Sequence, residues 1–390
     1  MKSNFFFMPI PQYFGAGISM EIGAQLAQLH SKKALVMYDK GVEAAGIPSK
    51  IVQCIQAEGI LVVQNGDVES DPSDTTVKRI AAIARQEQVD AVVAIGGGSS
   101  IDAAKCVKLL LNNSGALEDF YDLTRPQKPS GIPMIAIPTT SGTGSEASKG
   151  GVITDTSKGQ KRTIIGPGTM PDMALVDPEL TLSVPPNVTA ACAFDVLAHA
   201  IDAITSNMTN PITQAISYEA IRLMKGSYRQ AVEDGTNLQA RSDMHLASNL
   251  GGIVLSNAKC SVSHAFAHAM GALYHVPHGV CCAIFTPACL EYVADQRPEE
   301  IRKIAELLNT PFRKDESVAS IAWRAGETIH KMYRSVDVPD ITRFIPDADE
   351  AKRTLIPVAK QDIMATFSPR ALDDAGAGWI IDRTFELARQ

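Results

Sequence analysis

The chain has 390 residues, which is long enough for two domains with full-sized cores. A net charge of -7 and the lack of any Lys/Arg run argue against nucleic acid, so we expect small molecules as partners. No apolar run reaches the roughly eighteen residues of a membrane span, and the proline-broken start is not typical of a signal peptide. Seven cysteines without CxxC spacing favour reduced thiols in a cytoplasmic protein.

Short β-branched runs alternate with helix-like segments through the first half of the chain. This alternation is typical of a parallel sheet covered by helices, and it predicts a doubly wound, Rossmann-like α/β domain over residues 1–183. The expected strands and helices are the strands 34–39 and 60–68, the helices 46–59 and 75–88, the strand-turn-helix segment 89–111, and a strand with its following loop at 131–146.

From about residue 183 the pattern changes to long helical segments. The sequence therefore predicts an all-helical domain over residues 184–390. The expected helices are 187–206, 210–235, 238–275, 297–309, 317–336 and 375–390.

Two segments of the α/β half have the composition of nucleotide contacts. Gly96–Ser99 joins a strand to a helix, where glycines let a pyrophosphate approach free amides at the helix N-terminus. Pro138–Glu146 is a run of hydroxyl and glycine residues after a strand, although an ordinary Ser/Thr-capped loop reads the same way. Asp39 ends a strand where a carboxylate can accept from ribose hydroxyls and would repel a 2′-phosphate, which favours NAD over NADP. The usual GxGxxG after the first strand is absent.

The helical half contains a concentration of histidines within residues 264–279, which read HAFAHAMGALYHVPHG. His264 and His268 are four apart and share one helix face, as do Asp195 and His199 upstream. A single histidine on an apolar face is more often a core residue bonded to a carbonyl. Here a buried carboxylate would be costly without a cation, so the pattern predicts a divalent iron or zinc site.

Four motifs occur together and in order: the GGGS turn, the PTTxGTGSE loop, the DxxxH helix and the HxxxHxxGxxxxxPHG segment. In this combination the chain resembles the iron-dependent alcohol dehydrogenases, the group that includes lactaldehyde reductase and propanediol dehydrogenase. The resemblance covers essentially the whole chain. It implies a two-domain, usually dimeric NAD(P)-dependent oxidoreductase that interconverts an alcohol and its aldehyde with a divalent iron.

The resemblance also implies roles for individual residues. The metal ligands would be Asp195, His199, His264 and His278, and His268 would lie near the nicotinamide and relay protons. The nucleotide would be met by Asp39, Asp71, Gly97, Gly98, Ser99, Asp102, Thr139, Thr140, Thr143 and Lys161. At Asp71 the chain reads SDP, where many relatives read PNP.

The substrate region is where the chain departs from its relatives. Before VITD it has Lys149 and Gly150, and before His264 it has Lys259 where relatives often read NxGLGYVH. A lysine directed toward the metal would favour an anionic substrate, such as an ω-hydroxy acid, its semialdehyde, a sulfonate or a phosphonate. The alternative is that both lysines extend into solvent or contact cofactor phosphates. Leu255 and Met364 would add an apolar wall.

Three other functions stay open at this point. An NAD- and metal-dependent synthase of the dehydroquinate synthase type is the nearest rival, although such enzymes typically use three protein ligands. A zinc hydrolase is disfavoured because there is no HExxH. A metal-storage or scaffold protein would leave the glycine and threonine loops without a role.

Overall fold

The computed structural model describes residues 4–129 and 131–390. The chain forms two compact units, one over residues 8–184 and the other over residues 185–390 together with residues 4–7. The N-terminal residues join the helical unit because the Phe7 N–H donates to Asn257 Oδ1 (2.7 Å) and Asn257 Nδ2 donates to the Phe7 carbonyl (3.1 Å). The sequence pattern instead assigns residues 1–183 to the α/β domain.

The first unit is built on a six-stranded parallel sheet with the strand order β1-β8-β5-β4-β2-β3. The predicted parallel α/β architecture is confirmed. The strands are β1 (Gln12–Phe14), β2 (Lys33–Asp39), β3 (Leu61–Val68), β4 (Ala91–Gly96), β5 (Met134–Pro138) and β8 (Met173–Val176).

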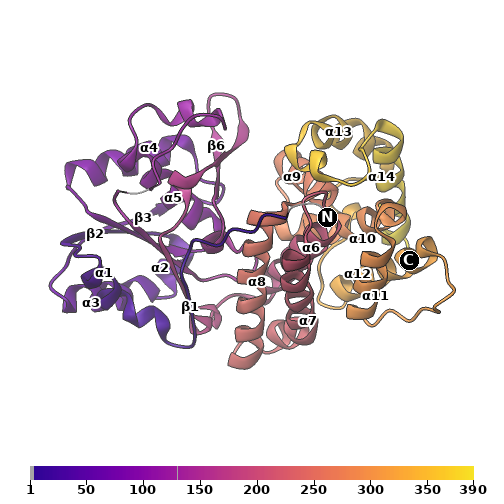
Figure 1. The fold of residues 1–390 in the computed structure, drawn as a ribbon, viewed down its shortest axis with the longest axis horizontal. Helices are drawn as coiled ribbons and strands as arrows, with labels where there is room; N and C mark the ends of the chain where they lie inside the picture. Colours follow the sequence, from indigo (N-terminus) through magenta and orange to yellow (C-terminus); the bar gives the residue numbers. More distant parts are fainter. Residues whose placement is uncertain (1–3, 130) are drawn as a thin grey trace. The chain divides into compact units, whose positions relative to one another are not determined.

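Helices cover both faces of this sheet, as Figure 1 shows for α1 and α3 on one face and α4 and α5 on the other. Alternate strand residues face opposite sides, so Val36 and Val93 pack with α1 and α3, whereas Leu35 and Val92 pack with α4 and α5. The helices are α1 (Ile22–Gln28), α2 (Lys40–Ala44), α3 (Ile47–Ala57), α4 (Asp74–Gln86) and α5 (Gly98–Asn112).

The strand order reverses between β2 and β4. From β2 the chain passes to β3 at one edge, and then returns to β4 on the other side of β2. The carboxyl ends of two parallel neighbours at such a reversal open into the crevice where α/β sheets bind ligands. Asp39 ends β2 and Gly96 ends β4, so the predicted ribose contact and the glycine turn lie at this point, and the Pro138–Glu146 loop begins at the end of the neighbouring β5.

A hairpin that the sequence analysis did not predict follows the threonine loop. It pairs β6 (Gly150–Asp155) with β7 (Gln160–Ile165) in antiparallel register. The fully buried Lys105 of α5 donates from Nζ to Ser145 Oγ (2.7 Å) and to the Gly150 carbonyl (2.6 Å). A buried ammonium satisfied by several acceptors thus fixes the start of the hairpin.

The second unit is all-helical, as predicted. Its helices are α6 (Pro186–Thr205), α7 (Pro211–Glu233), α8 (Leu238–Ala258), α9 (Val262–Tyr274), α10 (His278–Tyr292), α11 (Pro298–Leu307), α12 (Val318–Arg334), α13 (Ala348–Gln361) and α14 (Asp374–Ala388). The segment 238–275, expected as one helix, breaks at Lys259–Ser261 into α8 and α9. Helices α10 and α13 were not predicted.

Helix α6 is the central element of this unit. Long and apolar enough to span a membrane, it is mostly buried among α7, α8 and α10 and is therefore a core helix. Gly279, in the first turn of α10, lets α10 approach α6, because a Cβ there would lie 2.2 Å from the Ala191 carbonyl oxygen. The close approach of these two helices positions the site described below.

We expect Gly279→Ala to lower the free energy of unfolding by about 1–3 kcal/mol, because the clash is with backbone that cannot rotate away. Gly226→Ala is the matched control: it lies in α7, where nothing stands within 4 Å of an added Cβ, and it should stabilise the chain by about 0.5–1 kcal/mol. Urea unfolding measures both. Equal effects of the two substitutions would contradict the packing argument.

Candidate functional site

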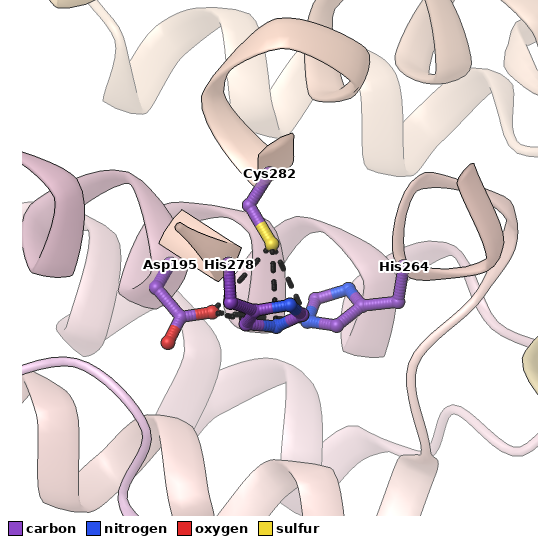
Figure 2. Close-up of side chains that lie close together, drawn as sticks. All are labelled: Asp195, His264, His278 and Cys282. Atoms are coloured by element: carbon purple, nitrogen blue, oxygen red, sulfur yellow. Dashed lines mark hydrogen bonds and ion pairs between the residues drawn. The ribbon is translucent and has the colours of Figure 1, made fainter. Parts of the chain in front are cut away.

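Four donor side chains converge in the helical unit. Figure 2 shows Asp195 of α6, His264 of α9, and His278 and Cys282 of α10 directed toward a common point. Asp195 Oδ1 lies 3.4 Å from His278 Nε2 and 4.0 Å from His264 Nε2. The ligating atoms of all four residues lie within 4.8 Å of one another, which is the spacing of a metal site.

His199 lies one turn along α6 from Asp195, as the sequence spacing predicted. Its Nε2 is 3.7 Å from Asp195 Oδ1, and its ring stacks on His264 with the centroids 4.8 Å apart. Its Nδ1 is buried without a hydrogen-bond partner among the described residues. The donors present, a carboxylate, imidazoles and a thiol, fit a divalent iron or zinc ion, and such an ion would compensate the buried charge of Asp195.

A second carboxylate orients His264. Asp202, one more turn along α6, accepts through Oδ2 from His264 Nδ1, the Ser261 N–H and the Ser263 hydroxyl, each at 2.8 Å. Because the carboxylate accepts from Nδ1, we assign the ring proton to Nδ1, which leaves the Nε2 lone pair directed toward Asp195 and Cys282. Carboxylate–histidine pairs of this kind fix the ligand tautomer at metal centres.

Burial controls the protonation of the site. Desolvation, with the nearby imidazoles of His199 and His268, holds the pKa of His264 well below its usual range. Desolvation likewise lowers the pKa of His278, against the opposing effect of Asp195. Burial raises the pKa of Asp202 to about 6, so its carboxylate is ionised at neutral pH. The imidazoles of His264 and His278 are therefore in the neutral form that binds a metal.

His268 faces the same cluster but has a partner of its own. Its Nδ1 lies 2.8 Å from Asp362 Oδ2, and its ring stacks on His278 with centroids 5.4 Å apart. Burial alone would raise the pKa of Asp362, but the hydrogen bond from His268 holds it below the usual value. The structure thus places His268 beside the ligands, with one nitrogen held by a carboxylate.

In the α/β unit, the glycine turn packs directly against the threonine loop. A Cβ added at Gly97 would lie 3.0 Å from Thr140 Oγ1, and one at Gly98 would lie 2.8 Å from Thr143 Cγ2. The Thr139 N–H donates to the last residue of β4 (3.0 Å). The five sequence-predicted residues therefore pack together in one place, and their contact with a phosphate-bearing ligand stays a prediction.

Three further predicted residues lie beside these segments. Lys161 Nζ donates to Asp71 Oδ1 (2.7 Å), and the Asp71 N–H donates to Ser99 Oγ (3.3 Å). Asp39 lies at the end of β2, where its Oδ1 accepts from the Val42 N–H (3.0 Å) and its Oδ2 from Ser100 Oγ (2.9 Å). A contact of these polar groups with a ribose stays a prediction.

Asp102 is held by protein groups on both oxygens. Its Oδ2 accepts from the Val152 N–H (2.9 Å), and its Oδ1 accepts from Ser145 Oγ (2.5 Å) and Lys105 Nζ (3.3 Å). These contacts tie α5 to the hairpin. A contact of Asp102 with pyrophosphate stays a prediction, and in this structure its carboxylate positions the loop.

The candidate substrate residues divide between the two units. Lys149 and Gly150 lie half-buried at the start of β6, where the Lys149 carbonyl accepts from Thr169 Oγ1 (2.6 Å). Leu255 and Lys259 lie half-buried at the C-terminal end of α8. Met364 is half-buried in the short helix Ile363–Phe367, directly after the Asp362 that contacts His268.

Comparison with known proteins assigns the family. The models described as "Iron-containing alcohol dehydrogenase" and "Fe-containing alcohol dehydrogenase family, C-terminal" match residues 9–178 and 189–375. The chain belongs to the iron-containing alcohol dehydrogenase family. It is 32% identical to the NAD-dependent methanol dehydrogenase of Bacillus methanolicus over 365 residues, which are 94% of this chain and 95% of that protein.

Solved iron-type alcohol dehydrogenases have the same fold. The structure of a 1,3-propanediol oxidoreductase superposes with a TM-score of 0.92 at 32% identity, over 98% of this chain and 100% of that one. A sulfoacetaldehyde reductase from Bifidobacterium kashiwanohense, in complex with NAD+, has a TM-score of 0.88 at 25% identity, over 100% and 99% of the two chains. The chain is therefore an oxidoreductase of the iron alcohol dehydrogenase type, as the motifs indicated.

Three functional side chains were not predicted. Asp202 follows Asp195 and His199 at seven and three residues, so helical spacing places all three on one face and could have found it. Cys282 is one turn after His278 on a helix that the sequence analysis did not assign. Asp362 gives no periodic signal, because it meets His268 across 94 residues of chain.

We expect Asp202→Asn to weaken zinc or ferrous binding by about 10- to 100-fold, because the Nδ1–H of His264 loses its ionised acceptor. Competition against a chromophoric chelator measures this affinity. Asp340→Asn, which removes the carboxylate that pairs with His330 elsewhere in the unit (3.1 Å), is the control and should leave metal affinity unchanged. Metal binding that is unaffected by Asp202→Asn would show that Asp202 does not orient a ligand.

Proposed function

We propose that this enzyme interconverts a small primary alcohol and its aldehyde with NAD(H), and that the substrate carries an anionic group such as a carboxylate, sulfonate or phosphonate. The observation that carries the proposal is the backbone of Lys259, which lies between α8 and α9, five residues before His264. Its φ of 66° and ψ of 166° fall in a region that only glycine adopts readily.

A lysine in this conformation costs on the order of 1–3 kcal/mol of strain. Glycine would adopt this conformation without strain. The chain therefore carries a cationic side chain at a position where the backbone conformation favours glycine. Such outliers gather at functional sites, where the surroundings hold them in place. The next residue, Cys260, groups with His199 and His264, which places the strained segment against the candidate metal ligands.

The ammonium group of Lys259 has a neutral carbonyl among its hydrogen-bond partners. Its Nζ donates to the Ser256 carbonyl at 3.2 Å, at the end of α8. A charge-assisted bond to an anionic substrate is stronger than a bond to a neutral carbonyl. The similarity to a protein named sulfoacetaldehyde reductase supports an anionic aldehyde, because that name describes one.

The chemistry divides between bound groups and this chain's own residues. When bound, the metal and NAD(H) supply Lewis acidity and hydride transfer. Asp195, His199, His264 and His278 would hold the metal, and Asp202 keeps His264 in the ligating tautomer. Asp362 accepts from Nδ1 of His268, so Nε2 of His268 is the nitrogen left to exchange a proton with solvent.

Asp39 supports NAD rather than NADP. Two donors, the Val42 N–H and the Ser100 hydroxyl, hold its carboxylate at the end of β2. A carboxylate fixed there accepts from ribose hydroxyls and repels a 2′-phosphate. Iron is the metal that the family name indicates, and zinc fits the same donors. We also propose that the enzyme is a cytoplasmic homodimer.

The test is NADH oxidation by ferrous-loaded enzyme against matched aldehydes, half neutral and half carrying carboxylate, sulfonate or phosphonate. We expect kcat/KM to favour an anionic member, and His264→Ala to abolish activity with the metal. A clear preference for the neutral aldehydes would contradict the anionic substrate. No NADH oxidation with any of these aldehydes, by a protein that still binds the nucleotide, would favour the synthase-like alternative.

The substitution Lys259→Gly tests the charge of the side chain and the strain of its backbone by two different measurements. It should lower kcat/KM for the preferred anionic aldehyde by about 10- to 100-fold, the loss of one charge-assisted bond, while a neutral aldehyde is unaffected. The same substitution should raise the free energy of unfolding by about 1 kcal/mol. Lys259→Arg is the control and should keep the anionic preference. An equal loss for neutral and anionic aldehydes would rule out a specific charge contact.

Asp362→Asn tests the proton path. Because the amide does not match the charge of the carboxylate, we expect kcat to fall on the order of 10²-fold and its pH profile to shift. Metal content and the Kd for NADH should not change. His268→Gln should have a similar effect that is not additive with Asp362→Asn. Additive losses in the double variant would mean that the two residues act independently.

A further inference from the structure

We propose that Cys282 is a ligand of the metal centre, so that this enzyme holds its ion with a thiolate in addition to Asp195, His199, His264 and His278. The inference rests on the metal centre of the proposed function and goes beyond it, because the family resemblance implies only one Asp and three His. Cys282 lies in α10, one turn after His278, and is fully buried.

The distances around the Cys282 sulfur are those of ligands on one ion. Its Sγ lies 3.5 Å from His278 Nε2, 3.6 Å from Asp195 Oδ1 and 3.9 Å from His264 Nε2. Two neighbouring ligand atoms that bind one ion at about 2.0–2.3 Å, with bond angles of about 90–110°, lie roughly 3.0–3.6 Å apart. The separations therefore match a shared ion, with contraction needed only on the His264 side.

The neighbouring cysteine shows that this placement is specific to Cys282. Cys281 is equally buried, but its Sγ lies 3.6 Å from the carbonyl of Val276, in the loop between α9 and α10. On a helix, adjacent side chains differ in direction by about 100°, so only one of the two thiols can face Asp195. Cys281 is thus an internal control of the same chemistry on the same helix.

A thiolate changes what the site binds. On metal binding the thiol releases its proton, one S–metal bond forms, and no electrons are transferred. The ligand charge with Asp195 becomes two negative units, which balances a divalent ion in the buried interior. Soft sulfur ligands favour zinc over ferrous ion, so Cys282 shifts the metal preference of this enzyme toward zinc.

The experiment uses cobalt(II) as a spectroscopic substitute for zinc in the full-length chain. A cobalt–thiolate bond gives an intense near-ultraviolet charge-transfer band, in addition to weak visible bands that report any bound cobalt. We expect both in the unaltered protein, because Cys282 supplies the sulfur. Cys282→Ser should lose the charge-transfer band and weaken zinc binding by about 10- to 100-fold or more.

Matched variants identify the cysteine that supplies the sulfur ligand. Cys281→Ser and Cys260→Ser should keep the charge-transfer band, and its loss in either would assign the thiolate to that residue and overturn the proposal. Cys282→Ala provides a second test if the serine variant folds poorly, and circular dichroism checks folding in each case. A band that persists in a folded Cys282 variant would also overturn it.

The cobalt spectra distinguish a failure of the Cys282 ligand from a failure of the proposed function. Visible cobalt bands without a charge-transfer band in the unaltered protein would overturn the Cys282 ligand and leave the metal-dependent dehydrogenase intact. The absence of both would overturn the metal centre and the Cys282 ligand together. Aldehyde reduction by the zinc-loaded protein then tests the proposed activity independently of the ligand assignment.

Discussion

The helical unit is organised around one buried carboxylate, that of Asp195. Asp195 is 3% exposed, and among the described residues its ion-pair partners are imidazoles only. Desolvation keeps His264 neutral, so it does not cancel the charge. A buried carboxylate without a cation is unfavourable, and α6, α9 and α10 bring their donor side chains to a point where a bound cation would remove that cost. The helix packing is therefore arranged around a charge, as well as around apolar surface.

The break between α8 and α9 follows from the same network. Asp202 accepts from the Ser261 N–H and from His264, so one carboxylate holds the first residues of α9 and the ligand that α9 carries. The backbone must leave the helical path at Lys259 to reach this geometry. The strained lysine and the oriented histidine are thus two results of one local constraint.

Much of the architecture could be predicted from the sequence because it depends on local periodicity. The β-branched strands, the glycine turn after β4 and the pairs at i and i+4 on α6 and α9 are all read within a few residues of one another. The helix break at Lys259 could not be predicted, since no glycine or proline marks it and its cause, Asp202, lies 59 residues from Ser261. The contacts of Asp362 and Lys105 could not be predicted for the same reason, because tertiary packing determines their partners.

Asp39 has a consequence for changing the cofactor of this enzyme. The carboxylate that we propose repels a 2′-phosphate is also the N-cap of α2 and the acceptor of a hydroxyl from Ser100 of α5. On this proposal, a small apolar residue such as alanine at position 39 would admit NADP(H) but would leave the first turn of α2 without its cap and Ser100 without its acceptor. A redesign for NADP(H) therefore has to keep the N-cap of α2. Serine or asparagine at position 39 could do so, because both are favoured N-cap residues.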